Sequence, residues 1–122
     1  MTNEQAPIQY DLEDRTARFG RAIIQFAKQV PENSVTRPII TQLVKSGTSV
    51  GANYCEADNA ETRKDFKHKI CICRKEVKET KHWLKMIETA DPGLSDQIEK
   101  LFQEAKELNL IFNAIVNSTV KG

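Results

Sequence analysis

The sequence predicts an all-α fold, an antiparallel up-down-up-down four-helix bundle that occupies residues 1–122 as a single domain. Apolar residues recur at steps of three and four in four separate stretches, which is the spacing that lines one face of a helix. Short segments rich in Pro, Gly, Asn and Asp separate these stretches, so neighbouring helices should run antiparallel. We find no convincing stretch with the alternating period of a β-strand.

The first predicted helix carries its apolar row over residues 12–30. Asp11 is a candidate N-cap, and the run from Pro31 to Ser34 should end the helix. We expect residues 1–9 to form a loose tail, and they lack the basic and apolar regions of a signal peptide. The row consists of Leu12, Thr16, Phe19, Ile23, Phe26 and Val30.

The second predicted helix carries its row over residues 40–57, and Pro38 fits the first turn, where a missing N–H costs little. The third carries its row over residues 66–87, and Thr62 with Asp65 resembles a capping box at its start. The second row is Ile40, Leu43, Gly47, Val50, Tyr54 and Ala57. The third row is Phe66, Ile70, Cys73, Val77, Thr80, Leu84 and Ile87.

The fourth predicted helix carries its row over residues 94–119, after a break at Asp91-Pro92-Gly93 and with Ser95 as a candidate cap. Apolar residues extend beyond the rows of the last two helices. Either a wider core or self-association accounts for this surplus. The fourth row is Leu94, Ile98, Leu101, Ala105, Leu108, Phe112, Ile115 and Thr119. The surplus is Phe102, Leu110, Ile111, Val116 and Val120, with Ile72, Trp83 and Met86 in the third helix.

The run from Gly47 to Gly51 matches the G-x-S-x-G motif of α/β hydrolases. That motif needs a strand before its serine and a sheet beneath it, whereas this run lies inside a helical period. We therefore predict no enzyme, and we interpret the small residues as a face that lets a neighbouring helix approach closely. Each mid-helix glycine costs about 1 kcal/mol relative to alanine. The candidate packing and oligomer residues are Gly47, Ser49, Gly51, Asn53, Tyr54, Glu56 and Trp83.

Metal and cofactor chemistry is poorly matched by the spacing of the polar residues. His68 and Cys71 could form a ligand pair at i, i+3, but Cys73 points to another face and is predicted to be a core residue. Glu79 and His82 give only one of the two Glu-x-x-His pairs of a di-iron bundle. We predict no metal, cofactor or small-molecule substrate, no membrane span, and a reducing, cytoplasmic location.

A line of cations on the third helix is the strongest functional feature. Residues 62–90 hold nine Lys or Arg against four acids, whereas the rest of the chain holds nine bases and thirteen acids. From position 67 onward, each of these cations directly follows a member of the third row, so it lies about 100° around the helix from the core. We call this set the basic row, and Cys71 occupies the gap in its spacing. Its members are Lys64, Lys67, Arg74, Lys78, Lys81 and Lys85.

Two functions fit the basic row. It can bind the phosphate backbone of RNA or DNA, with little sequence discrimination because no aromatic platform or phosphate loop accompanies it. Alternatively, the chain is a scaffolding oligomer that binds a protein partner, and the row pairs with acids of the fourth helix or of another subunit. Those acids are Asp96, Glu99, Glu104 and Glu107.

Four segments of the sequence resemble one bacterial family, the four helix bundle proteins, also called 23S rRNA-intervening-sequence proteins. The segments are Asp11 to Thr16, Lys45 to Ala57, Lys64 to Lys69 and Lys78 to Leu84. The resemblance implies an antiparallel four-helix bundle that assembles into a ring-like homo-oligomer, expected to be a pentamer. A distantly related branch contains the accessory proteins of diversity-generating retroelements, which are implicated in nucleic-acid binding. The resemblance implies no established biochemical function.

Overall fold

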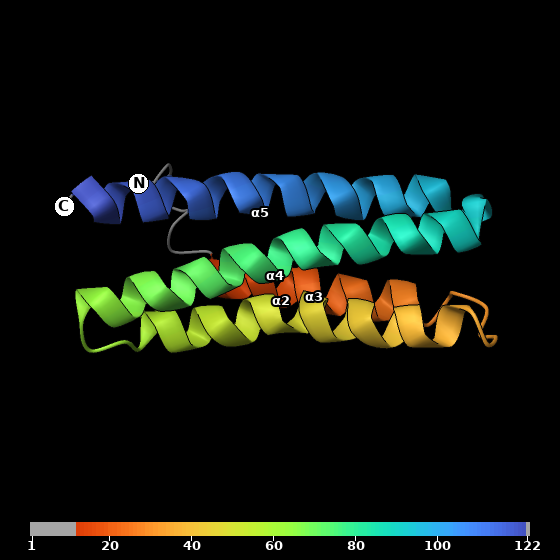
Figure 1. Cartoon of the computed structure of the whole chain (residues 1–122), viewed down its shortest axis with the longest axis horizontal. Helices are drawn as coiled ribbons and strands as arrows, with labels where there is room; N and C mark the ends of the chain where they lie inside the picture. The colour runs from red at the N-terminus through yellow and green to blue at the C-terminus, as the bar shows by residue number, and fades with distance from the viewer. Residues whose placement is uncertain (1–11, 122) are drawn as a thin grey trace.

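Four antiparallel helices make up the part of the chain that this computed structural model describes, residues 12–121, with side chains through residue 118 (Figure 1). The all-α bundle predicted from the apolar rows is confirmed, and no strand occurs within residues 12–121. The predicted cap Asp11 and the predicted tail, residues 1–9, lie outside the described residues. The elements are α2 (Leu12–Ala27), α3 (Thr36–Asp58), α4 (Arg63–Ala90), the 3-10 helix η1 (Pro92–Leu94) and α5 (Ser95–Lys121).

The helices pack in the order of the chain. α3 lies between α2 and α4, and α5 packs along α4. α2 and α5 meet over a much smaller area, and within the described residues α2 has no close contact with α4, which lies diagonally across the bundle. α2 has only 16 residues, whereas α4 has 28 and α5 has 27, so α5 extends past the start of α2 (Figure 1). None of the described helices is long and apolar enough to cross a membrane.

The predicted apolar rows form the core, with one shift in α5. The first row is buried throughout, and Leu43, Val77 and Leu84 are fully buried on α3 and α4. On α5, Ile115 is only partly buried, whereas Val116, predicted to lie off the row, is buried. Ile98 and Val116 are five helical turns apart at 3.6 residues per turn, so they share a face that the predicted row had left by position 115.

The helix ends follow the sequence signals in part. Pro38 lies in the first turn of α3, and the Thr62 side chain accepts a hydrogen bond from the Asp65 backbone N–H at 3.0 Å, as predicted. Ser95 is the first residue of α5 rather than the residue before it, and its hydroxyl donates to the Pro92 carbonyl oxygen. The predicted end of the first helix at Pro31 is also wrong. α2 stops at Ala27; the Lys28 N–H still donates to the Ile24 carbonyl oxygen at i−4, and Gln29 and Val30 continue in tighter i to i−3 hydrogen bonds.

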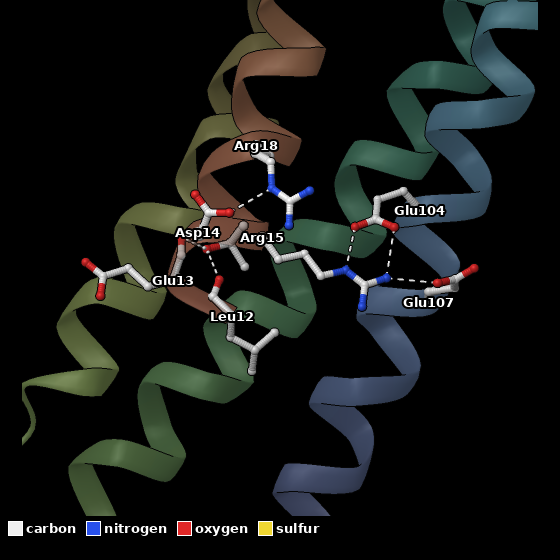
Figure 2. A network of polar contacts seen from close by, with 8 residues as sticks. Leu12, Glu13, Asp14, Arg15, Arg18, Glu104 and Glu107 are labelled. Atoms are coloured by element: carbon white, nitrogen blue, oxygen red, sulfur yellow. Dashed lines mark hydrogen bonds and ion pairs between the residues drawn. The ribbon is translucent and has the colours of Figure 1, made fainter. Parts of the chain in front are cut away.

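Arg15 closes the small contact between α2 and α5 with charge-assisted hydrogen bonds (Figure 2). Its Nε and Nη2 atoms donate to the two carboxylate oxygens of Glu104 at 2.7 and 2.9 Å, and Nη2 also donates to Glu107 at 2.8 Å. The hydrogen bond with Glu104 raises the pKa of Arg15 above its ordinary value. The side chain of Arg15 is 21% exposed, so solvent screens this contact less than it screens an open surface pair.

Replacing Arg15 by lysine should lower the free energy of unfolding by about 1 kcal/mol, because an ammonium group cannot make the bidentate contact. Urea denaturation at low and high salt measures this loss, which should shrink as salt rises. Arg18→Lys is the matched control, since Arg18 pairs with Asp14 at a site where the two side chains are 60% and 67% exposed. Equal losses for the two variants would contradict a special role for Arg15.

Candidate nucleic-acid interface

Three members of the basic row, Arg74, Lys81 and Lys85, contact α5 along the line where α5 packs on α4. The Arg74 Nη1 atom donates a hydrogen bond to the side-chain oxygen of Asn113 on α5 at 3.1 Å. The Nζ atoms of Lys81 and Lys85 lie 5.7 and 5.4 Å from the ring centroid of Phe102, also on α5. These contacts place the central and C-terminal parts of the row on one flank of α4, beside a neighbouring helix rather than on its outermost surface.

No acid neutralises the basic row within the described part of the chain. None of its six members forms an ion pair there. Two of the α5 acids proposed as its partners, Glu104 and Glu107, bind Arg15 on α2 instead (Figure 2). Pairing of the row with the acids of α5, one form of the alternative raised by the sequence, is therefore not observed within the chain.

Lys81 shows that the cations lie close enough to disfavour one another. Burial lowers the pKa of Lys81, and the positive charges of Lys78, Lys106 and Lys85 lower it further. A lowered lysine pKa means that the protein environment disfavours the charged form. An anion bound beside Lys81 would favour its charged form again.

The sequence analysis did not predict that one face of α5 lies beside the basic row. Phe102, Lys106, Asn109 and Asn113 follow one another at steps of 4, 3 and 4, so they share a helix face. The side-chain oxygen of Asn109 is buried and has no hydrogen-bond partner. The spacing was visible in the sequence. Which flank of α4 this face would meet depends on how the two helices are rotated, and no residue pattern gives that rotation.

The N-terminal part of the basic row is less closely held. Lys64 is exposed in the first turn of α4, and Lys67 is partly buried one turn later. Cys71, in the gap of the row, is partly buried and accepts a weak hydrogen bond from Arg74 Nη2 at 3.9 Å. The row therefore has its densest positive charge between Arg74 and Lys85.

The opposite flank of α4 faces α3 and has a mixed charge. Lys69 forms an ion pair with Glu56 of α3, one of the predicted packing residues. Trp83, another of them, is partly buried and donates its indole N–H to Glu79 at 3.2 Å. Burial and the neighbouring Glu79 raise the pKa of Glu76 on this flank. The α3 side of α4 therefore carries both signs of charge, whereas Arg74, Lys81 and Lys85 lie on its α5 side.

The small residues of α3 lie against α2. A Cβ atom on Gly47 would lie 2.9 Å from two side-chain carbons of Ile23, and one on Gly51 would lie 3.4 Å from the Thr16 backbone. The whole G-x-S-x-G run is inside α3, with no strand before it among the described residues. This position removes the strand-to-helix turn that a hydrolase nucleophile needs.

The remaining packing candidates on α3 make local contacts. Ser49 Oγ donates to the Lys45 carbonyl oxygen, and Asn53 Nδ2 donates to the Ser49 carbonyl oxygen, both within the same helix. Tyr54 is buried, and its burial together with the Asp58 carboxylate raises the pKa of its phenol.

The cysteines are separate in environment. Cys55 is exposed, Cys71 is partly buried and Cys73 is fully buried, and all three are free thiols. Burial raises the pKa of Cys73 to about 12, and its thiol lies 3.6 Å from the Val50 carbonyl oxygen. Cys73 is the core residue that was predicted. Within residues 12–121, no group of three or more His, Cys, Asp or Glu side chains could hold a metal ion.

Comparison with known proteins gives one family and one related fold. The sequence profile of a family described as 23S rRNA-intervening sequence protein matches residues 9–114. The crystal structure of a protein with unknown function from the S23 ribosomal protein family of Bacteroides thetaiotaomicron is similar, with a TM-score of 0.76 and 30% identity. The match covers 85% of this chain and 96% of that one. No curated protein matches the chain.

Proposed function

The chain belongs to the 23S rRNA-intervening sequence protein family, and we propose that it is a non-enzymatic homo-oligomer that binds the backbone of RNA or DNA through the basic row. The observation that carries the proposal is the lack of any ion pair on the row within the described residues. Unpaired cations in line keep their full attraction for a polyanion. The distance from Lys67 to Lys85 is about 27 Å at 1.5 Å per residue, long enough for several phosphates.

Self-association is supported by apolar surface that the single chain leaves exposed. Leu110 on α5 is 67% exposed and Ile24 on α2 is 39% exposed. Ile24 also borders a groove of about 370 Å³ between α2 and α3, which Ala17, Gly20 and Ala52 help to line. Apolar surface of this kind is commonly covered by another subunit. We propose a pentamer, as the family resemblance implies, in the cytoplasm, where free thiols persist.

The salt dependence of binding tests the proposed function. Fluorescence anisotropy with a labelled RNA should show a logarithm of affinity that falls linearly with the logarithm of salt concentration, with a slope of about −4 if six phosphates are contacted. The affinity should then drop by more than about a hundredfold between 50 and 200 mM salt.

Failure to bind either RNA or DNA at low salt would contradict the proposal. It would instead favour the scaffold, in which an acidic protein partner or a neighbouring subunit covers the row. Light scattering on the same samples gives the mass in multiples of the 13.9 kDa chain and so tests self-association independently.

A further inference from the structure

The ring of Phe102, on α5, lies beside two cations of the basic row on α4. Two ammonium groups, those of Lys81 and Lys85, lie over the ring at 5.7 and 5.4 Å from its centroid. The ring packs against the core but remains only partly buried. A partly exposed aromatic ring beside a row of unpaired cations has the composition of a site that binds a single nucleic-acid strand.

The cations around this ring are crowded in the free protein. Partial burial lowers the pKa of Lys81, and the positive charges of Lys78, Lys106 and Lys85 lower it further. Among the described residues, no carboxylate forms an ion pair with any of these four lysines. The two ammonium groups therefore share one phenyl ring despite their mutual repulsion. Phosphate groups would relieve that repulsion and draw the lysine side chains off the ring.

We propose that the Phe102 ring stacks against an unpaired base, so that the surface formed by Phe102, Lys81 and Lys85 binds single-stranded RNA or DNA in preference to a duplex. The inference rests on the proposed function and adds the class of nucleic acid. The phosphates on either side of the stacked base would take Lys81, Lys85 and Lys106 as their partners. Since every base has an aromatic face, such a site accepts many sequences.

A duplex cannot use the ring in this way, because its bases are already stacked and paired inside the double helix. Its backbone phosphates would contact Lys81, Lys85 and Lys106, and none of its bases would stack on Phe102. The ring lies near the C-terminal end of the basic row, beside Lys81 and Lys85. A single strand would therefore run along the row from Lys67 and place a base on Phe102 near one end.

The sequence predicts no aromatic platform beside the basic row, whereas the structure places the Phe102 ring against Lys81 and Lys85. Phe102 belongs to a different helix, and the sequence indicated only that it lay off the apolar row of its own helix. Packing of α5 along α4 brings the ring to the basic row. An aromatic side chain contributed by a neighbouring helix is invisible to a search for motifs along one segment.

The test compares the intact protein with its Phe102→Leu variant, which keeps an apolar side chain against the core and removes the aromatic face. Three labelled probes share one sequence: a single-stranded RNA, the same strand as DNA, and the corresponding duplex. Phe102→Leu should weaken binding of the single strands by about tenfold and leave duplex binding unchanged, because stacking serves only unpaired bases. Equal losses for the RNA and DNA strands indicate stacking alone, and a larger loss for one identifies the preferred strand.

Two further variants serve as controls. Phe102→Tyr retains the aromatic face and should bind single strands like the natural protein. Phe66→Leu makes the same change at another partly buried phenylalanine, on the core row of α4, and should leave binding unchanged. A fluorescent base analogue in the single strand should be quenched by the natural protein and much less by Phe102→Leu, which reports stacking directly.

The outcomes separate the two proposals. If no probe binds at low salt, the proposed function itself fails. If the single strands bind equally well to the natural protein and Phe102→Leu, the backbone proposal stands and the stacking site is overturned. An equal loss of single-stranded and duplex binding also overturns the stacking site, because Phe102 would then serve only to hold the lysines in place.

Discussion

Replacing both Lys78 and Lys81 by glutamate should weaken the binding of RNA or DNA by about a thousandfold at low salt. Each change removes one attraction to a phosphate and adds one repulsion, and each such interaction is worth about 1 kcal/mol in water at 4 Å. The slope of the logarithm of affinity against the logarithm of salt concentration should also become less negative, by the amount that about two phosphate contacts contribute. Fluorescence anisotropy over a salt series measures both quantities.

The same double variant should keep its stability to within about 0.5 kcal/mol, because relief of charge crowding offsets the lost contact between Lys81 and the Phe102 ring. Burial and the charges of Lys78, Lys106 and Lys85 disfavour the charged form of Lys81, so this crowding opposes folding. The new carboxylate at position 81 would lie four residues before Lys85, an arrangement that stabilises a helix by about 0.3 kcal/mol. If the two lysines bind a ligand and do not stabilise the fold, their replacement should weaken binding and leave stability unchanged or higher. A loss of both would point to a structural role for the two lysines.

The matched control is Arg21→Glu with Lys28→Glu. It makes the same change in net charge at two exposed positions, on α2 and directly after it. Because α2 lies diagonally across the bundle from α4, this pair should change binding only through the net charge of the whole protein. If the two double variants weaken binding equally, the basic row is not the binding surface.

Replacing Gly47 by valine should lower the free energy of unfolding by about 3 kcal/mol, the upper end of the usual cost of overpacking. The added Cβ would lie 2.9 Å from Ile23 Cγ1 and Cγ2 and 3.1 Å from Ile23 Cβ. Those atoms are close to the Ile23 backbone, so rotation of a flexible side-chain end cannot remove the overlap. The α2 and α3 backbones must separate instead. Urea denaturation followed by circular dichroism measures the loss.

Gly20→Ala is the control for this prediction. Its added Cβ would have ordinary contacts, the nearest at 3.5 Å from Thr48 Cα, so alanine should raise stability by up to about 1 kcal/mol through its helix propensity. In an Ile23→Ala background, the cost of Gly47→Val should fall by about 1 kcal/mol or more, since the two sites are in contact. Additive losses for Gly47→Val and Ile23→Ala would show that they act independently.

The sequence was sufficient for most of the fold because each apolar row depends only on local spacing. Phe19, Leu43, Val77 and Leu108 all lie in predicted rows and are buried. The errors occur where residues outside the pattern decide the outcome, either nearby in the chain or on another helix. Ser95 became part of α5 because the segment from Pro92 to Leu94 folds into a 3-10 turn, in which Asp91 accepts a hydrogen bond from the Gly93 N–H.

The candidate site was predictable only in part, for the same reason. The row from Lys64 to Lys85 follows from the spacing within one helix. Its partner face, with Phe102 and Lys106, depends on the rotation of α5 about its own axis when it packs on α4. The hydrogen bonds from Arg15 to Glu104 also depend on that rotation. A carboxylate that binds Arg15 does not neutralise the basic row. These features could be recognised only once both helices were placed.

The order of helix packing has a consequence for how the protein folds. The three extensive helix contacts all join neighbours in the sequence, and the one contact between distant segments, α2 with α5, is small. Each hairpin therefore closes a short loop at little entropic cost, and a topology this local is typical of proteins that fold within microseconds to milliseconds. The chain can pair α2 with α3, and α3 with α4, while its C-terminal segment is still being synthesised. Docking of Arg15 against α5 then completes the bundle.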